Sequence, residues 1–188
     1  MGMPASLRWT SADLETLPYD DRRYEIIDGE LYVSKQPHWH HQATCGNLFA
    51  LLRSWSLATK LGEANLAPGV IFADDDDVAP DVVWISAVRL RTLLDETGKL
   101  RGAPELVIEV LSPGSTNEQR DREAKLKLYS RRGVDEYWIV DWRERTVDVY
   151  RREGAALALT EHLSGDDRLM SPLLPGFTAQ LPDFFPLQ

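Results

Sequence analysis

The sequence is poor in cysteine and contains no long run of apolar residues. Cys45 is the only cysteine among 188 residues, which excludes an internal disulfide and a zinc site made of four cysteines. No stretch approaches the roughly 18 apolar residues that cross a bilayer, and the N-terminus lacks the apolar core of a signal peptide. The sequence therefore predicts a cytoplasmic protein with no membrane partner.

Positive charge is also scarce. The chain has 21 Lys and Arg against 30 Asp and Glu, and 21 − 30 gives a net charge of −9. This charge argues against a bulk electrostatic grip on nucleic acid. The hydrophobic fraction of 43%, with six Trp, excludes a wholly disordered chain. No repeat or low-complexity linker interrupts the sequence, so we expect residues 1–188 to form a single domain.

Several motifs of other enzyme classes are missing. Neither the phosphate loop G-x-x-x-x-G-K nor the nucleophile elbow G-x-S-x-G occurs. The acidic run 74–77 lacks the spaced acids, the central glycine and the closing glutamate of a calcium loop. We interpret that run as a solvent-exposed hairpin tip, away from any site.

Strand and helix patterns alternate along the chain. Helical spacing and capping residues predict four helices, over 10–17, 39–60, 88–95 and 116–132. Apolar runs and turn signals predict strands in 24–33 (a hairpin around Asp28-Gly29), 70–72, 80–85, 105–111, 136–141 and 146–151, with short strands and proline-rich turns after residue 155. This order predicts an α/β or α+β fold with a mixed central β-sheet flanked by helices. The unit from Glu105 to Val140 should be a right-handed parallel crossover.

Glu109 is the first candidate for chemistry. It lies inside Leu106–Leu111, a run expected to be a buried central strand, where a carboxylate is costly unless it is paired or binds a cation. Alternation places Glu105, Val107, Glu109 and Leu111 on one face. A solvated edge strand, or a salt bridge to an arginine, is the alternative interpretation.

Asp81 and Lys125 complete the pattern. Asp81 opens the strand before that of Glu109, and two such acids could converge on one Mg²⁺ ion, although a turn aspartate capping a loop is the simpler interpretation of Asp81 alone. On a helix with about 100° per residue, Lys125 falls inside the apolar arc and Lys127 falls outside it. An inward lysine needs an acidic partner or a function, unless it snorkels along the face. Two acids and a lysine are the parts of a metal-dependent phosphodiesterase, in which the acids hold the ion and the lysine orients the attacking water or stabilises the developing charge.

The sequence resembles the Uma-two family. On the basis of fold and motif, that family is assigned to the restriction endonucleases with the PD-(D/E)xK fold. The resemblance covers nearly the whole chain. It lies in Tyr24–Glu30, Pro80–Val83, Pro104–Pro113, Gly133–Asp141, Leu174–Phe177 and Asp183–Phe185.

The resemblance implies a set of site residues. Asp81 matches the family's PD acid and Glu109 its strand acid, and these two would bind the metal. Leu111 stands where the plain motif has lysine, but the family carries its lysine on the next helix, four residues before a tyrosine. The remaining matches are Lys125 and Tyr129 at that spacing, Glu25 as the early acid, and His41 and Gln42 as a pair at the start of the long helix.

The histidines near that pair could suggest zinc. His38, His40, His41 and Cys45 are clustered, and His41 and Cys45 lie one helical turn apart. A zinc site needs further ligands, and none has an evident spacing. A structural histidine, or one beside the phosphate, is the favoured interpretation.

We therefore predict a Mg²⁺-dependent endonuclease, with Mn²⁺ as a substitute, that hydrolyses DNA phosphodiester bonds. Basic residues gather on the helix that carries Lys125, so the net charge of −9 does not exclude a local phosphate site. The alternative from another class is a non-catalytic interaction or nucleic-acid-binding module that keeps the fold. Trp142 and the pair Phe184-Phe185, if exposed, would suggest an interface, and we expect a homodimer.

Overall fold

A six-stranded mixed β-sheet forms the centre of the molecule. The computed structural model describes residues 7–18, 20 and 22–186. The strand order is β10-β9-β8-β7-β6-β3. These strands are β3 (Gly62–Leu66), β6 (Val82–Ser86), β7 (Leu106–Val110), β8 (Glu136–Asp141), β9 (Thr146–Glu153) and β10 (Ala156–Leu163). β7 and β8 run parallel and the other neighbours run antiparallel, which confirms the mixed sheet.

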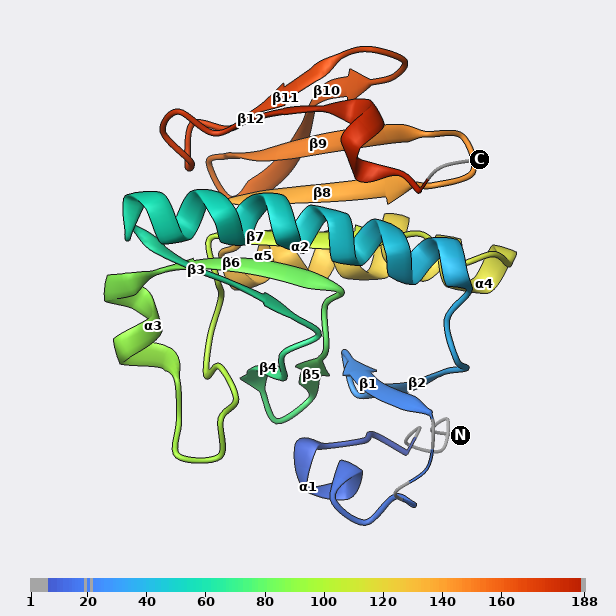
Figure 1. Cartoon of the computed structure of the whole chain (residues 1–188). Coiled ribbons are helices and arrows are strands. Elements are labelled where there is room, and N and C mark those ends of the chain that lie inside the picture. The colour runs from blue at the N-terminus through green and yellow to red at the C-terminus, as the bar shows by residue number, and fades with distance from the viewer. Residues whose placement is uncertain (1–6, 19, 21, 187–188) are drawn as a thin grey trace.

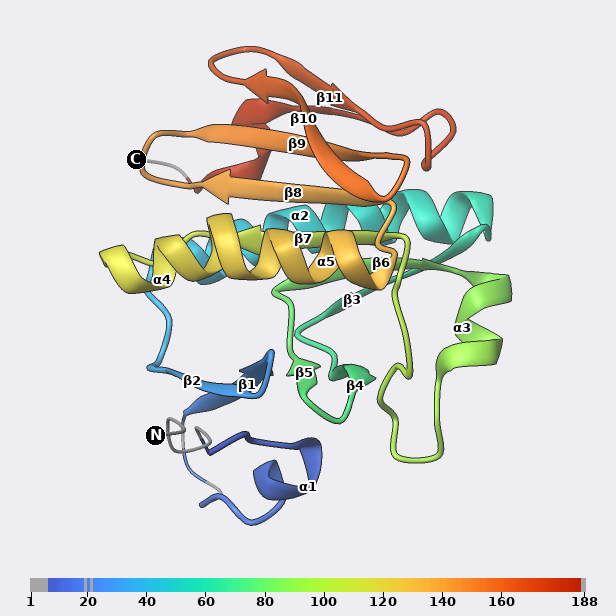
Figure 2. The same cartoon turned by 180° about the vertical axis from the view of Figure 1, so that it is seen from behind.

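Helices cover both faces of this sheet. The long helix α2 (Trp39–Thr59) crosses one face (Figure 1), and a continuous helical segment crosses the other (Figure 2). That segment consists of α4 (Ser115–Gln119), the π-helical η1 (Arg120–Lys125) and α5 (Leu126–Arg132). Each helix packs on its own apolar cluster, so the sheet is buried on both sides. The predicted α+β class is confirmed.

The central strand β7 shows how the sequence divides between the two clusters. Leu106, Ile108 and Val110 belong to the cluster under α2, whereas Val107 and Leu111 belong to the cluster under α5. This is the alternation expected of a strand. Glu109 shares the second face, so a carboxylate stands among the apolar side chains beneath α5.

A smaller sheet lies beside the main one, below it in Figure 1. Its order is β2-β1-β5-β4. The strands are β1 (Arg23–Ile27), β2 (Glu30–Ser34), β4 (Val70–Ala73) and β5 (Asp76–Val78). The predicted hairpin of β1 and β2 is confirmed, and its turn residues Asp28 and Gly29 have φ values of 52° and 74°. Such left-handed turn residues match the twist of the two strands.

Only the first half of the acidic run 74–77 is a hairpin tip: Asp74 and Asp75 form the turn between β4 and β5, and Asp74 is exposed. Asp76 and Asp77 belong to β5 and are buried. Asp76 accepts hydrogen bonds from Arg131 and Arg132 on α5 and from the backbone N–H of Asp28. Because these partners lie far away in the sequence, local composition gave the wrong prediction here.

The sequence patterns do not predict the strand β3, because they indicate only that Gly62 ends the long helix. A Cβ atom at Gly62 would lie 2.2 Å from the carbonyl oxygen of Ile85, so glycine lets β3 approach β6 closely. The expected N-terminal helix is shorter than predicted. The remaining elements are α1 (Ser11–Leu14), α3 (Ala87–Leu93), β11 (Arg168–Met170), β12 (Thr178–Gln180) and the 3₁₀ helix η2 (Leu181–Phe184).

The aromatic residues that suggested an interface are not free. Phe184 and Phe185 are buried in the cluster under α2. Trp142 is half-buried and stacks on His38, with ring centroids 4.8 Å apart. In the described part of the chain, none of the helices combines the length and apolar character needed to cross a membrane.

Candidate active site

The carboxylates of Asp81 and Glu109 come together at one end of the main sheet. β6 and β7 pair with Val82 opposite Ile108, and one further step of this antiparallel register sets Asp81 beside Glu109. The backbone N–H of Val110 also donates to Asp81 Oδ2 at 2.9 Å. Both acids line one pocket of about 230 Å³. The fold thus brings the two predicted metal ligands to the same cavity.

Glu109 is held from behind by two side chains of the helical segment. Lys125 Nζ lies 2.8 Å from Glu109 Oε1, and the hydroxyl of Tyr129 donates to the same oxygen at 2.7 Å. Lys125 and Tyr129 are both fully buried and do not line the pocket. Among the described residues, both side-chain hydrogen bonds to Glu109 go to Oε1 and none goes to Oε2. Glu109 is therefore paired with a lysine and not with an arginine. Its strand, β7, lies between β6 and β8 and is not an edge strand.

Glu25 completes the environment of Lys125. It lies on β1, and its Oε1 is 3.0 Å from Lys125 Nζ and accepts from the backbone N–H of Ala79 at 3.0 Å. Its Oε2 is buried with no hydrogen bond to the described residues, and Arg120 lies 3.9 Å from it. Lys125 thus bridges two acids that come from different sheets.

A π-helical turn aims three charged residues inward at once. Arg120, Asp121 and Lys125 are all buried, although α-helical residues five apart point about 140° away from each other. A π-turn bonds each residue to the fifth along, which brings Arg120 and Lys125 toward one side. The predicted inward direction of Lys125 and outward direction of Lys127 both agree with the structure. The inward Arg120 was missed because the prediction assumed α-helical spacing.

Burial and neighbouring charges set the protonation of this cluster. Burial, with help from Asp81 and Glu25, raises the pKa of Glu109 to about 8 in spite of Lys125. Burial also disfavours the Lys125 ammonium, but Glu109, Glu25 and Asp121 outweigh it and hold the lysine pKa above its usual value. For Glu25, Lys125 and Arg120 overcome burial and lower the carboxyl pKa. Lys125 therefore stays charged, while Glu109 holds a proton more tightly than an ordinary glutamate does.

Asp81 has its own cationic partners. Arg23 lies 2.9 Å from Oδ1, and His41 Nε2 lies 3.2 Å from Oδ2. Burial opposes the charged carboxylate, but His41 and Arg23 lower its pKa below the ordinary range. Asp81 in turn raises the pKa of His41 against the effect of burial. His41 and Gln42 line the same pocket, as the position of the pair in the sequence implied.

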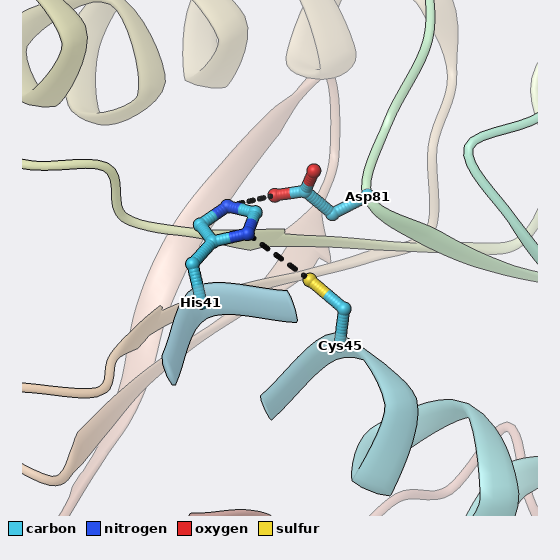
Figure 3. A group of neighbouring side chains, drawn as sticks. All are labelled: His41, Cys45 and Asp81. Atoms are coloured by element: carbon cyan, nitrogen blue, oxygen red, sulfur yellow. Dashed lines mark hydrogen bonds and ion pairs between the residues drawn. The ribbon is translucent and has the colours of Figure 1, made fainter. Parts of the chain in front are cut away.

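His41 also contacts Cys45 (Figure 3). Its Nδ1 lies 3.6 Å from Cys45 Sγ, while its Nε2 faces Asp81. The other two histidines take no part, since His38 accepts a hydrogen bond from the backbone of His40 at the start of α2 and both rings pack on Trp142. The predicted structural role of the histidines therefore fits His38 and His40.

Sequence reasoning missed the cations that line the pocket. Arg23 is two residues before Glu25 on β1, so strand alternation could have paired them on one face. The cationic side chains of the lining are Arg22, Arg23, Lys35 and Arg120.

The other basic residues of the helical segment do not form a phosphate surface. Most are paired with acids outside the pocket: Arg122 with Asp148, and Arg131 and Arg132 with Asp76. The cations at the pocket instead come from Arg120 of η1, from Arg22 and Arg23 at the start of β1, and from Lys35 just after β2.

The donor set at the pocket suits a hard divalent cation. Mg²⁺ takes carboxylate oxygens and keeps several water ligands. Glu109 Oε2 is outside the bonds to Lys125 and Tyr129, and Asp81 reaches the same cavity. Both oxygens of Asp81 already have partners, so a metal ion would displace Arg23 or His41 from one of them.

Comparison with solved structures shows a shared fold. The chain is similar to the crystal structure of a putative nuclease belonging to DUF820 from Anabaena variabilis ATCC 29413, with a TM-score of 0.73 and 21% sequence identity. The alignment covers 93% of this chain and 96% of that one. None of the curated proteins compared gives a significant match.

The architecture is thus that of a nuclease-like α+β protein. A family model described as "Putative restriction endonuclease", Uma2, matches residues 11–182. The chain belongs to the Uma2 family, which confirms the resemblance seen in its sequence motifs.

Proposed function

We propose that this protein is a metal-dependent endonuclease that hydrolyses DNA phosphodiester bonds with Mg²⁺, for which Mn²⁺ can substitute. One observation carries the proposal: Glu109 lines a pocket together with Asp81 while the buried Lys125 and Tyr129 bind only its Oε1. This arrangement keeps the other oxygen of Glu109 available at the cavity. A carboxylate buried so deeply is costly unless it is paired or binds a cation, and Glu109 has both a partner at Oε1 and access to the cavity.

Each side chain then has a distinct role. Asp81 and Glu109 would hold the ion, which when bound supplies positive charge at the phosphate and a water of lowered pKa. Lys125 and Tyr129 fix the orientation of Glu109, and Glu25 helps to keep Lys125 charged. The sequence pattern predicts that Lys125 acts on the attacking water or the phosphate; because Lys125 is fully buried behind Glu109 and does not line the pocket, we propose instead that it positions Glu109.

DNA is the proposed substrate because positively charged side chains line the pocket although the chain as a whole is negative. Four cationic side chains line it, against a net charge of −9 overall. Arg23 and Arg120 are close enough to neutralise a phosphodiester that enters beside Asp81 and Glu109. The surrounding negative surface predicts weak binding that falls with added salt.

The test is a cleavage assay on plasmid and single-stranded DNA with Mg²⁺ and with Mn²⁺. Glu109→Gln and Lys125→Ala should each abolish metal-dependent cleavage. Glu136→Gln is a matched control, because Glu136 is a buried acid of the neighbouring strand outside the pocket. Cleavage that is unchanged in both site variants would refute the assignment.

A non-catalytic interaction module is the second candidate, and one observation favours it. Asp81 is paired with Arg23 and His41, and Glu109 with Lys125, which is the arrangement expected of acids that serve only the fold. Titration with Mn²⁺ followed by its paramagnetic signal separates the two candidates. A nuclease site binds the ion and loses it in Glu109→Gln, whereas an interaction module binds none in either protein.

The proposed homodimer would let two such sites cut both strands of a duplex. Sedimentation equilibrium of the purified protein tests it. The cytoplasmic location stays a prediction from the sequence.

A further inference from the structure

Three buried side chains that carry possible metal ligands, an imidazole, a thiol and a carboxylate, meet at the edge of the pocket. His41 and Cys45 lie one turn apart on α2, and Asp81 approaches them from the end of the sheet (Figure 3). One ligand atom from each lies within 4.8 Å of the other two. The proposed hydrolysis gives Cys45 no role, although its thiol is buried next to a pocket residue.

We propose that His41, Cys45 and Asp81 form a second metal site, suited to Zn²⁺ or a similarly soft divalent ion, that shares Asp81 with the magnesium site. Thiolate and imidazole are ligands that Zn²⁺ takes readily and Mg²⁺ avoids. From sequence spacing alone, zinc lacked a third ligand. The fold supplies it, because the end of β6 brings Asp81 to the first turns of α2.

The distances are close to those of a tetrahedral zinc site. Bond lengths of about 2.3 Å to sulfur and about 2.1 Å to nitrogen or oxygen set ligand separations of about 3.6 Å for S···N and about 3.4 Å for N···O. Cys45 Sγ lies 3.6 Å from His41 Nδ1, and His41 Nε2 lies 3.2 Å from Asp81 Oδ2. These two contacts use opposite ring nitrogens, so the side chains must rearrange before one nitrogen of His41 shares an ion with both partners. One ligand atom from each of the three residues lies within 4.8 Å of the others before any such movement.

The surroundings leave one coordination position open. His41 and Asp81 line the pocket, whereas Cys45 lies behind them. A bound ion would thus have three protein ligands and a water molecule on the pocket side, which is a common zinc arrangement. The Cys45 S–H proton leaves to solvent as the zinc–sulfur bond forms, because a coordinating thiol is deprotonated.

Without a metal ion the thiol has little chemistry of its own. Burial and the charge of Asp81 raise the pKa of Cys45 far above its usual value. A thiol in that state is a poor nucleophile. The positions of His41 and Asp81 beside the thiol, and not its acidity, support metal binding.

Sharing Asp81 has a consequence for activity. An ion held by His41 and Cys45 removes Asp81 from the magnesium site, so Zn²⁺ should inhibit Mg²⁺-dependent cleavage. This inhibition rests on the proposed function, whereas the binding of Zn²⁺ does not. The two are measured separately.

Cobalt substitution tests the binding directly. Co²⁺ added to the wild-type protein should give the near-ultraviolet charge-transfer absorption of a thiolate ligand. Cys45 is the only cysteine, so the band needs no further assignment and no variant that must fold. A cobalt complex without that band would overturn the proposal.

Zinc affinity gives the second test, by competition with a chromophoric chelator. Cys45→Ala should weaken Zn²⁺ binding by about 100-fold or more, since even outer-shell substitutions cost about 10–100-fold. Thr44→Ala is the matched control, because Thr44 is buried on the same turn and offers no ligand to the cluster. Equal Zn²⁺ affinity in wild type and Cys45→Ala would overturn the site.

The inhibition arm uses the cleavage assay. Zn²⁺ should inhibit wild type and Thr44→Ala at concentrations about 100-fold lower than those needed for Cys45→Ala. Equal inhibition of all three would overturn the sharing of Asp81. If no cleavage is found at all, the cobalt band and the chelator competition still decide whether the metal site exists.

Discussion

Two clusters of charged residues surround buried acids in this protein, and they differ in how completely those acids are paired. The first, here the Asp76 cluster, consists of Asp76, Asp28, Arg131 and Arg132. Asp76 is fully buried and accepts from both arginines and from the backbone N–H of Asp28, at distances near 2.9 Å. The guanidinium groups reach the surface, so their charges stay partly solvated. This cluster fastens the small sheet to the end of α5.

The second group, here the site cluster, consists of Glu25, Glu109, Asp121, Arg120 and Lys125. All five are buried, and the three acids share Lys125. Glu25 Oε2 has no hydrogen bond to the described residues, and Glu109 opens onto the pocket. In the Asp76 cluster, which joins the small sheet to α5, the buried carboxylate is thus fully paired. In the site cluster, which lies beside the pocket, the pairing of the charged groups is incomplete, and a cation or phosphate that enters the pocket can complete it.

The largest effect is expected from removing the cation at the centre of the site cluster. Lys125→Met leaves Glu25, Glu109 and Asp121 buried without their shared partner, which should lower the free energy of unfolding by about 4 kcal/mol. Urea denaturation followed by tryptophan fluorescence measures the loss. Adding Glu109→Gln to Lys125→Met should recover part of it, because one uncompensated acid is gone. A double variant no more stable than Lys125→Met would show that Lys125 acts through packing alone.

The same experiment on the Asp76 cluster should give a smaller loss. Asp76→Asn removes the charge between Arg131 and Arg132 but keeps an acceptor for Asp28, and the arginines can turn to water. We expect about 2 kcal/mol lost from the free energy of unfolding, with metal binding unchanged. A variant that also loses Mn²⁺ binding would mean that the two clusters are coupled, which would break the comparison.

Arg23 gives a third test of the comparison, in which a substitution at the pocket should strengthen metal binding rather than weaken the fold. It pairs with Asp81 at the pocket, so Arg23→Gln removes a positive charge that competes with a metal ion for that carboxylate. The Mn²⁺ affinity should rise about tenfold, which corresponds to about 1.4 kcal/mol. Titration followed by the paramagnetic signal of Mn²⁺ measures the change.

Arg22→Gln is the control for this prediction. Arg22 lines the same pocket but pairs with Asp20, at 3.4 Å, and not with Asp81. Its substitution should change the Mn²⁺ affinity much less. Similar gains in both variants would mean that general charge, rather than the ion pair with Asp81, limits metal binding.

The site was more predictable from the sequence than its surroundings. Glu109 could be singled out because a carboxylate inside a continuous apolar strand is physically costly, and Lys125 because helical spacing turns it inward. Both arguments use periodicities of two and about four residues, which the sequence displays directly. The fold class followed from the same patterns.

The rest depended on contacts between distant segments. Arg120 and Asp121 have charged side chains that resemble solvent-exposed ones in sequence, and the π-helical turn buries them, while β1 brings the half-buried Arg23 to Asp81. The acidic run 74–77 failed for the same reason, since its partners on α5 lie about 55 residues away. Composition predicts exposure correctly only when no distant segment supplies a counter-charge.

Asp77 gives the smallest predicted effect and tests how a buried acid behaves when it lacks the arginine partners of Asp76. It adjoins Asp76 in β5 but has no matching arginines: Lys99 lies 4.0 Å away and Oδ2 has no hydrogen bond to the described residues. Burial therefore raises the pKa of Asp77. The folded chain holds this proton more tightly than the unfolded chain, so the contribution to stability is present at low pH and lost as the pH rises through the raised folded-state pKa.

Asp77→Asn should accordingly stabilise the protein by about 1 kcal/mol at pH 7, and the gain should vanish near pH 3, where the wild-type carboxyl is protonated. Urea denaturation at the two pH values measures the difference. Asp74→Asn, at an exposed position of the same run, should leave stability unchanged at both. A loss of stability in Asp77→Asn at pH 7 would mean that the distant Lys99 outweighs burial. Asp77 would then belong with Asp76 among the acids whose charge stabilises the fold.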